Sequence, residues 1–415
     1  MYTRALAGAY REHGELAGFC DSNQLRVAWH NRALAEEFGL PPVPAYEPAD
    51  FERMLDEQKV DTAIVTSMDS THHRYTAGAV RAGRDVITEK PLTIDAPRCQ
   101  EILDAVRDSG RRVTVAFNYR YAQRNARIKQ LLADGAIGTV LSAHFEWLLD
   151  TNHGADYFRR WHRNKESSGG LMVHKASHHF DLLNWWLGGR PETVFGFGRL
   201  GFYGRENGQR RGVARAYARA HGAPDARGDP YALQLDADPT LAGLYLNAED
   251  ADGYWRDRNV FDEGISIEDD IALVLRYSTG AAVSYHLTAY APWEGYRVAF
   301  NGTEGRLELE AAERTFAVQS TDRSRRRAPS SFVHISIRPH WREPTEVEVS
   351  PSEDDGGHSG ADLALLNALF GGGADDPLNR GSSHVDGALA ILPGIGANRS
   401  FATGEAVDLT QLVRL

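Results

Sequence analysis

The chain has 415 residues, 42% of them hydrophobic and 25% charged, and a formal net charge of −11. Its length favours two domains, its composition excludes collagen-like, disordered and disulfide-rich proteins, and its acidic balance argues against broad contact with nucleic acid or anionic lipid. The low cysteine content, the lack of an apolar N-terminal signal sequence and the lack of any apolar run of about 18–20 residues predict a soluble, cytoplasmic protein with no membrane contact.

Helices and strands alternate along the first part of the chain. The expected strands are 15–21, 60–67, 85–91 and 112–119, and the expected helices are the first dozen residues, 25–38, 50–57, 72–82 and 96–109. This alternation predicts βαβ units and hence a Rossmann-like, doubly wound parallel sheet with helices on both faces. Ligands of such a sheet bind outside the carboxyl ends of its strands, so polar residues there are the first candidates for a site.

The second part of the chain has many alternating strands and fewer helices. The expected strands are 140–149, 192–198, 270–277, 281–290, 296–302 and 305–310, and the expected helices are 125–134, 171–187, 362–370 and 385–394. This pattern predicts an α/β domain with an open, mainly antiparallel sheet, in which 202–262 and 322–357 are loop insertions. We therefore expect a first domain over 1–122 and a second over 123–415, with the helix at 385–394 packing back on the first.

Several polar residues follow the predicted strands of the first domain and suit a dinucleotide cofactor. Asp21 ends the first strand, where its carboxylate can accept hydrogen bonds from both ribose hydroxyls and would repel a 2′-phosphate. This favours NAD over NADP, although Arg26 leaves room for the phosphate; a helix-capping or turn aspartate is the alternative. The cofactor-binding candidates from these strand ends are Asp21, Ser22, Arg26, Thr66, Asp69, Thr71, His72, Glu89 and Lys90.

The glycine-rich turn of a dinucleotide site is absent from its expected place, because no strand and no G-x-G-x-x-G precede Tyr2. One match, GFGRLG at 196–201, lies in the antiparallel part and does not directly open a helix, so we interpret it as fortuitous. The missing strand would be central to the sheet. We expect its absence to leave two strands unpaired and to remove backbone N–H groups that would hold a pyrophosphate.

Two segments carry groups suited to proton transfer. In Glu89-Lys90-Pro91, burial at a strand end would lower the pKa of the lysine, which could orient or polarise a substrate hydroxyl. His174, His178 and Asp181 recur at spacings of four and three, so one continuous helix would place them on one face. A histidine there suits proton transfer near neutral pH; a metal site and a plain polar helix face are the alternatives.

The segment 151–170 mixes aromatic and charged residues between the two parts of the chain. Aromatic faces can stack on the C–H faces of sugars and charged groups can bind their hydroxyls, although packing between domains explains the aromatic residues about as well. With the segments described above, the substrate-binding candidates are Lys90, Tyr157, Arg160, Trp161, His162, His174, Lys175 and His178.

Taken together, these features resemble the Gfo/Idh/MocA family of NAD(P)-dependent oxidoreductases, named after glucose–fructose oxidoreductase and inositol dehydrogenase. The resemblance covers nearly the whole chain and rests on four matches, which are EKP at 89–91, the acid at Asp21, NYRY at 118–121 and G-G-x-x-x-H-x-x-x-H-x-x-D at 169–181. His174 stands where the family usually has an aspartate, which marks a departure in the proton-transfer site.

The resemblance implies a set of roles and a quaternary structure. Lys90 and His178 would flank the reacting carbinol carbon, and Asn118 and Arg120 would join the cofactor-binding residues. The chain would lack the N-terminal strand and glycine-rich loop of its relatives. Relatives of this kind often assemble through the open sheet, so a homo-oligomer, dimer or tetramer, is expected.

We therefore expect an oxidoreductase that moves hydride between nicotinamide and a secondary alcohol carbon of a sugar, glycoside or cyclitol, with no metal. His178 would remove the hydroxyl proton, Lys90 would hold the same oxygen and favour the alkoxide, and His174 would orient or relay. Asp181 would position the helix. The alternatives are a glycoside-cleaving enzyme that uses bound NAD as a transient oxidant, a non-catalytic family member and, as the weakest, a metal enzyme.

Overall fold

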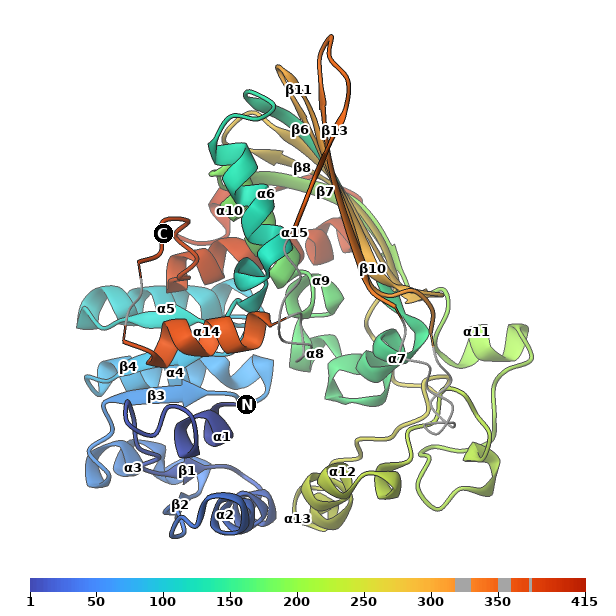
Figure 1. Ribbon diagram of the computed structural model, residues 1–415. Helices are drawn as coiled ribbons and strands as arrows, with labels where there is room; N and C mark the ends of the chain where they lie inside the picture. Colours follow the sequence, from blue (N-terminus) through green and yellow to red (C-terminus); the bar gives the residue numbers. More distant parts are fainter. Residues whose placement is uncertain (318–329, 350–359, 373–374) are drawn as a thin grey trace.

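A computed structural model describes residues 1–317, 330–349, 360–372 and 375–415. Its first part is a Rossmann-like domain of short parallel strands and flanking helices (Figure 1). The strands are β1 (Phe19–Cys20), β2 (Ala45–Tyr46), β3 (Thr62–Val65), β4 (Asp85–Thr88) and β5 (Val113–Val115), and the helices are α1 (Tyr2–Ala7), α2 (Gln24–Phe38), α3 (Phe51–Glu57), α4 (His72–Arg81) and α5 (Ala96–Ser109). The expected parallel α/β organisation is therefore confirmed.

The parallel strands of this domain form two separate sheets, β1–β2 and β3–β4–β5. Within the described residues, β1 and β3 each pair on one side only, as expected for a sheet that lacks a strand between them. Most strands are shorter than the sequence predicted, and the first helix ends at Ala7 instead of continuing for a dozen residues. Side chains of α1, among them Tyr2 and Leu6, pack in a small core with Ile64 of β3.

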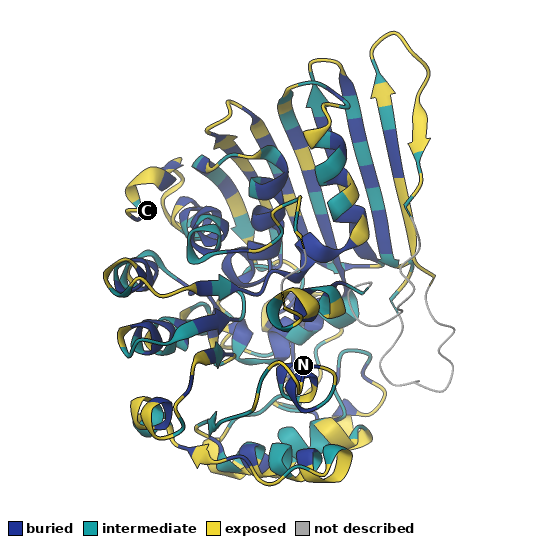
Figure 2. Cartoon of the chain, turned by 60° about the vertical axis from the view of Figure 1, so that its left-hand side comes forward, coloured by how far each residue is buried: buried dark blue, intermediate teal, exposed yellow. Residues whose placement is uncertain are grey.

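The second part is built on a nine-stranded sheet with the order β13-β12-β11-β10-β6-β9-β8-β7-β14. Its strands are β6 (Val140–Asp150), β7 (Pro191–Arg199), β8 (Asp270–Tyr277), β9 (Ala282–Ala291), β10 (Glu294–Gly302), β11 (Gly305–Arg314), β12 (Phe332–Pro339), β13 (Thr345–Val347) and β14 (Val407–Asp408). All neighbours are antiparallel except β6 and β9. Buried and exposed residues alternate along most of these strands (Figure 2), so one face packs on the core and the other is left open.

Two sequence expectations about this sheet have clear outcomes. The prediction that 322–357 is a loop insertion was wrong for its described part, because β12 and β13 lie there and extend the sheet at its edge. The interpretation of GFGRLG as fortuitous is confirmed, because 196–199 lie inside β7. A side chain at Gly196 would lie 2.3 Å from the backbone oxygen of Ala272, so close strand packing explains that glycine.

Helices cover the inner face of the large sheet and connect it to the first domain (Figure 1). A further helix, α14 (Ala361–Phe370), packs instead with α1 in the small core of the first domain. The helices between the sheet and the first domain are α6 (Gln123–Ala133), α7 (Thr151–Arg159), α8 (Lys165–Ser168), α9 (Leu171–His174), α10 (Ser177–Leu187) and α15 (His384–Thr403). The last of these, α15, is longer than predicted and joins both parts. Its Ala388 and Ile391 belong to the core of the Rossmann-like domain, whereas Ala397 belongs to the core under the large sheet.

The predicted continuous helix over 171–187 is interrupted between α9 and α10. The Ala176 N–H donates to the Leu171 carbonyl over 2.8 Å, one residue further back than in an α-helix. The wide turn changes the direction of the chain after His174. The prediction that His174, His178 and Asp181 share one regular helical face was therefore wrong. Every residue from Leu171 to Leu183 is buried, so the apolar pattern contained no signal for the interruption.

The insertion at 202–262 crosses from the large sheet to the first domain (Figure 1). It contains the short helices α11 (Arg205–Arg210), α12 (Pro239–Leu244) and α13 (Glu249–Asp252). Asn23 Nδ2 donates to the Ala248 carbonyl over 2.8 Å, and Arg26 pairs with Asp252 at 2.8 Å. The insertion therefore packs on the N-terminal end of α2. None of the helices in the described part of the chain has the length and hydropathy of a membrane-spanning segment.

Candidate active site

The proposed lysine is held at the carboxyl end of β4 by a network from both parts of the chain. Lys90 follows this strand and precedes a cis peptide bond to Pro91. The ring nitrogens of His72, at the start of α4, lie 2.8 Å from the Pro91 carbonyl oxygen and 3.0 Å from that of Ser67. His72 thus connects the segments that follow β3 and β4.

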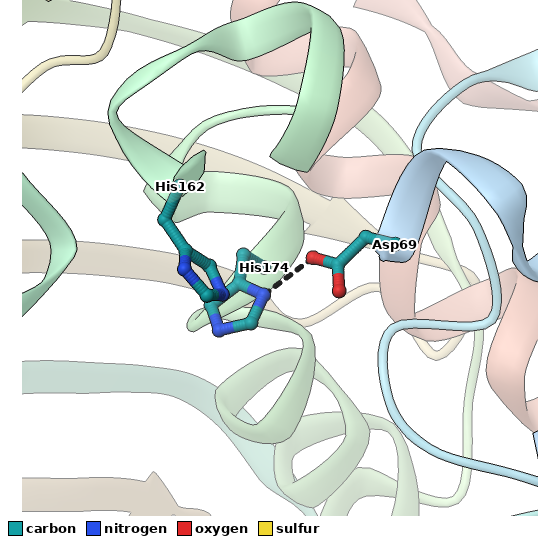
Figure 3. Close-up of side chains that lie close together, drawn as sticks. All are labelled: Asp69, His162 and His174. Carbon is teal, nitrogen blue, oxygen red and sulfur yellow. Dashed lines mark hydrogen bonds and ion pairs between the residues drawn. The ribbon is translucent and has the colours of Figure 1, made fainter. Parts of the chain in front are cut away.

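Lys90, His174 and Asp69 form a continuous chain of hydrogen bonds. The Lys90 Nζ donates to His174 Nε2 over 3.1 Å and to the His174 carbonyl over 3.3 Å. His174 Nδ1 donates to Asp69 Oδ2 over 2.5 Å (Figure 3). An ammonium group has three N–H donors. Two of them point to His174, so the third is available to an oxygen of a bound substrate.

The wide turn after α9 makes this arrangement possible. In a continuous α-helix the His174 carbonyl would accept from the backbone N–H four residues later. Here the Ser177 hydroxyl donates to that carbonyl over 3.0 Å, and Lys90 Nζ reaches the same oxygen. The interruption of the helix therefore creates an acceptor for the lysine.

Burial sets the charge states of this chain of groups. It lowers the pKa of Lys90 to about 8, and the negative charge of Asp69 opposes that fall. Burial also lowers the pKa of His174 well below its usual value, with Lys90 adding to the effect, so the imidazole is neutral at pH 7. Burial raises the pKa of Asp69, and the cations Lys90 and Arg160 counter this rise. The net pKa of Asp69 is raised well above its usual value. The hydrogen-bond geometry assigns an ammonium to Lys90, a neutral imidazole to His174 and an accepting carboxylate to Asp69.

Asp69, His162 and His174 also come close enough to hold a metal ion, since one ligand atom from each lies within 4.8 Å of the others (Figure 3). This is a different set from the His174 and His178 pair considered in the sequence. Two observations favour proton transfer over metal binding. The Lys90 ammonium already donates to His174 Nε2, and Lys90 and Arg160 lower the pKa of both His162 and His174. A divalent cation would add charge beside two cations.

Lys175 and His178 lie just beyond this chain of groups. Lys175 is buried with its Nζ 5.0 Å from the Trp147 ring centre and 3.4 Å from the Tyr119 hydroxyl, to which it donates. The His178 ring packs edge-on against Tyr119, at 4.7 Å between ring centres. Burial is the largest cause of the lowered pKa of His174, and the charge of His178 adds to it.

Tyr157, Trp161 and His162 surround His174 from the segment 151–170. The ring centre of Tyr157 lies 5.5 Å from that of His174, and that of His162 lies 4.2 Å from it. Trp161 stacks on His162 at 3.6 Å. This segment therefore joins the proton-transfer groups, as the sequence predicted for a substrate-binding element.

The structure also adds a group that the sequence did not single out. His153 Nδ1 lies 2.5 Å from Glu294 Oε1, and its Nε2 lies 3.1 Å from the Tyr157 hydroxyl. Glu294 is buried, and His153 lowers the pKa of its carboxyl to about 2 in spite of that burial. Glu294 opens β10, far along the chain from Tyr157, and no local motif marked it. The Tyr157 hydroxyl thus contacts His153, which in turn pairs with the Glu294 carboxylate.

The cofactor candidates divide into two groups. Asp21, Ser22, Thr66, Thr71 and Glu89 lie at the ends of β1, β3 and β4, as expected, with Glu89 accepting a hydrogen bond from the Tyr2 hydroxyl over 2.9 Å. The second group, Arg26 and Arg120, forms ion pairs within the protein. Arg26 is engaged by the insertion, and Arg120 makes a two-point ion pair with Asp181 at 2.6 and 2.8 Å.

The strand ends fit a dinucleotide in two respects. Among the described residues, the Asp21 carboxylate is engaged through Oδ1, which accepts from the Asn23 N–H over 2.7 Å. Asn118 donates through Nδ2 to Asp362, while its Oδ1 is buried and has no hydrogen-bond partner in the described part of the chain. An acid at the end of β1 and an unsatisfied amide oxygen in the segment after β5 suit a nucleoside and a carboxamide.

Comparison with known proteins decides the family. The description "Oxidoreductase family, NAD-binding Rossmann fold" matches residues 1–117, and "Oxidoreductase family, C-terminal alpha/beta domain" matches residues 129–361. The protein named "Putative oxidoreductase YteT" from Bacillus subtilis (strain 168) is 35% identical over 427 residues, which cover 100% of this chain and 96% of that protein. The chain belongs to the Gfo/Idh/MocA oxidoreductase family.

Further relatives of this Gfo/Idh/MocA protein match a part of the chain or the fold alone. Inositol 2-dehydrogenase of Klebsiella pneumoniae (strain 342) is 34% identical over 152 residues, covering 36% of this chain and 41% of that protein. A solved structure of aldose-aldose oxidoreductase from Caulobacter crescentus has a TM-score of 0.61 at 17% identity and covers 98% of this chain and 96% of its own. The two-domain Gfo/Idh/MocA fold and the oxidoreductase class expected from the sequence are thus confirmed.

Proposed function

We propose that the protein is an NAD-dependent dehydrogenase that oxidises a secondary alcohol of a sugar, glycoside or cyclitol. One observation carries the proposal, namely the Lys90 ammonium that is fixed by two hydrogen bonds to His174 and keeps a third donor for a substrate oxygen. The names of the relatives, an inositol dehydrogenase and an aldose oxidoreductase, support the substrate class.

Each residue of the proposed site would have a separate role in removing the proton and the hydride from the substrate alcohol. Lys90 holds the oxygen and stabilises the negative charge that grows on it as the hydroxyl proton leaves. His178 accepts that proton. His174 fixes Lys90, and Asp69 fixes the imidazole of His174 with its proton on Nδ1. Bound NAD would supply the hydride acceptor, with Asp21 and Asn118 among the residues that hold it.

NAD is proposed over NADP because of two features of β1 and α2. The Asp21 carboxylate would repel a 2′-phosphate, and Arg26, the cation that could offset it, pairs with Asp252. The test is the ratio of kcat/KM for the two cofactors. A preference for NADP would refute this assignment.

A screen of sugars, glycosides and cyclitols, followed through the absorbance of reduced nicotinamide, tests the function itself. At least one member of the screen should reduce NAD with saturable kinetics. Tight NAD binding without turnover of any polyol would contradict the proposal and would support the non-catalytic alternative.

Replacing Asp69 with asparagine tests the assigned charge states. The Asp69 carboxylate raises the pKa of Lys90, which is about 8, so the variant should have a lower lysine pKa. Lys90 acts as an ammonium, and activity should therefore fall at lower pH in the variant than in the wild type. We expect the alkaline midpoint of kcat/KM to move down by roughly 1 pH unit.

The control for this experiment is Asp108→Asn, because Asp108 is an exposed carboxylate of α5 that pairs with Arg107. Its pH profile should match that of the wild type. An alkaline midpoint that stays in place or rises in Asp69→Asn would show that Asp69 does not control the charge of Lys90.

A second candidate function is cleavage of a glycoside through transient oxidation by bound NAD. The Glu294–His153–Tyr157 contacts favour it, because elimination next to a newly formed carbonyl needs a second proton-transfer group. Such an enzyme would release the aglycone without net NADH and would exchange the hydrogen next to the carbonyl with solvent. Stoichiometric NADH without exchange would leave the dehydrogenase as the function.

We also propose a homo-oligomer that assembles through the open face of the large sheet. Phe197 of β7 and Val274 of β8 are 69% and 56% exposed on neighbouring strands, which is more than a monomer needs to expose there. Light scattering after size exclusion measures the mass, and a monomer at micromolar concentration would contradict this assembly. The two free cysteines agree with the proposed cytoplasmic location.

A further inference from the structure

Three arginines converge on one carboxylate beside the proposed active site. Arg256 of the insertion donates to both oxygens of Asp156, at 2.7 and 3.0 Å. Arg160 donates to Asp156 over 3.2 Å, and Arg159 lies 3.6 Å from it. These contacts, together with the proximity of Arg256, lower the pKa of Asp156, which is therefore ionised. Three guanidinium cations thus share a single negative charge.

Arg160 is the most accessible of the three, since its side chain is more exposed than those of Arg159 and Arg256. Arg256 already holds Asp156 by two bonds, the geometry of a complete arginine–carboxylate pair. Arg160 contributes a single hydrogen bond from its five N–H donors. Its Nε is buried and has no hydrogen-bond partner among the residues that the structure describes. Its side chain is still 28% exposed, so the guanidinium remains within reach of a ligand.

Arg160 lies between the proton-transfer groups and the insertion. It precedes Trp161 and His162, which stack on each other and pack against His174. It also lowers the pKa of Lys90 and of His174, which places its charge close to both. A substrate whose hydroxyl is held by Lys90 would therefore have this cation nearby.

Burying arginine donors without acceptors costs stability, so a structural role alone does not explain the arrangement. One arginine would neutralise Asp156, and Arg256 does so. Asp156 therefore does not balance the charge of Arg160, and the other carboxyl group that this charge reaches, Asp69, is already bonded to His174. An anionic group on the ligand would balance the charge of Arg160.

We propose that the substrate is an acidic carbohydrate, a sugar or glycoside with a carboxylate that Arg160 binds while Lys90 holds the reacting hydroxyl. This inference rests on the proposed dehydrogenase function and names its substrate class. Arg256 keeps Asp156 in position and so sets the orientation of Arg160. A phosphate of the cofactor could offer Arg160 similar charge, and the experiment separates the two sources.

The test compares matched pairs, galacturonate with galactose and glucuronate with glucose, each as the free sugar and as the methyl glycoside. The wild type should have a kcat/KM for the acidic member at least about 10-fold above that for the neutral member, since a charge-assisted hydrogen bond accounts for about 10- to 100-fold. Arg160→Gln should abolish this preference, mainly through KM, and Arg160→Lys should restore part of it.

Arg210→Gln is the matched control, because Arg210 is an exposed arginine of α11. It should keep the preference for the acidic member. The melting temperature of each variant shows whether the fold is intact, and calorimetry with NAD alone reports the cofactor site. NAD affinity should not change in Arg160→Gln.

Each contrary result has a distinct meaning. If the neutral sugars were oxidised with an equal or higher kcat/KM than the acidic ones, the proposal of an acidic substrate would be refuted. The proposed dehydrogenase function would still stand. A loss of NAD affinity in a folded Arg160→Gln variant would assign Arg160 to a phosphate of the cofactor. This result would also refute the proposal of an acidic substrate. If the enzyme oxidised none of the paired sugars and none of the polyols in the wider screen, the proposed dehydrogenase function would be refuted.

Discussion

Lys90→Met is expected to lower kcat/KM for the oxidised carbohydrate by about 1,000-fold, within the range of single groups that stabilise charge or transfer protons in a transition state. Methionine keeps most of the length and apolar volume of the lysine side chain. It removes the donors that bind His174 and the substrate oxygen. Stopped-flow absorbance of reduced nicotinamide in a single turnover measures the step directly.

The control for this variant is Lys59→Met, since Lys59 is an exposed lysine of the same domain. It should retain wild-type kinetics. NAD binding by Lys90→Met, measured by calorimetry, should persist, because the nucleoside candidates lie at other strand ends. A Lys90→Met enzyme within 10-fold of the wild type would remove the lysine from the mechanism.

Arg120→Ala is expected to destabilise the protein by about 3–5 kcal/mol, the usual cost of leaving one member of a buried ion pair alone. Arg120 and Asp181 are 3% and 1% exposed and make two hydrogen bonds to each other. Arg120 also reaches Asp386 in the first turn of α15, over 3.1 Å. The variant would leave Asp181 buried without its cation and would loosen the contact between α10 and α15.

Urea unfolding followed by tryptophan fluorescence measures this loss. Arg107→Ala is the matched control, because Arg107 is 64% exposed in its pairs with Asp104 and Asp108, and such surface pairs contribute about 0–1 kcal/mol. Equal midpoints for the two variants would show that the buried pair contributes no more than a surface pair. The resemblance placed Arg120 with the cofactor, so this result also decides between a structural and a binding role.

The fold follows from the sequence wherever periodicity and length distinguish strand from helix. The boundaries of α2, α4 and α5 lie within a residue or so of the expected ones, because Asn23 and Asp95 cap two of these helices and glycines end them. The wide turn after His174 could not be predicted, because both sides of that segment are buried. β12, which lies next to the edge strand β13, is largely exposed along its first residues, and its weak pattern resembled a loop.

The candidate site was predictable in its residue types but not in its pairings. EKP and the histidines of 174–178 identify proton-transfer groups by their chemistry. The contact of Asp69 with His174 joins residues 105 positions apart, and Asp69 was assigned to the cofactor because its position at a strand end suits that role as well. Glu294 and Arg256 carry no local motif. Their roles arise from the register of β10 and from the path of the insertion, which a single sequence does not specify.

The central claim is that Lys90, which follows β4, acts with His174 at the end of α9 and His178 in α10 on one hydroxyl. A crystal structure of the protein with NAD and an oxidisable polyol is the most direct measurement of this claim. The account predicts the Lys90 amine at about 3 Å from the reacting oxygen, still bonded to His174, with the His178 ring at the same hydroxyl. A nicotinamide bound away from Lys90, or a substrate hydroxyl held by other residues, would contradict it.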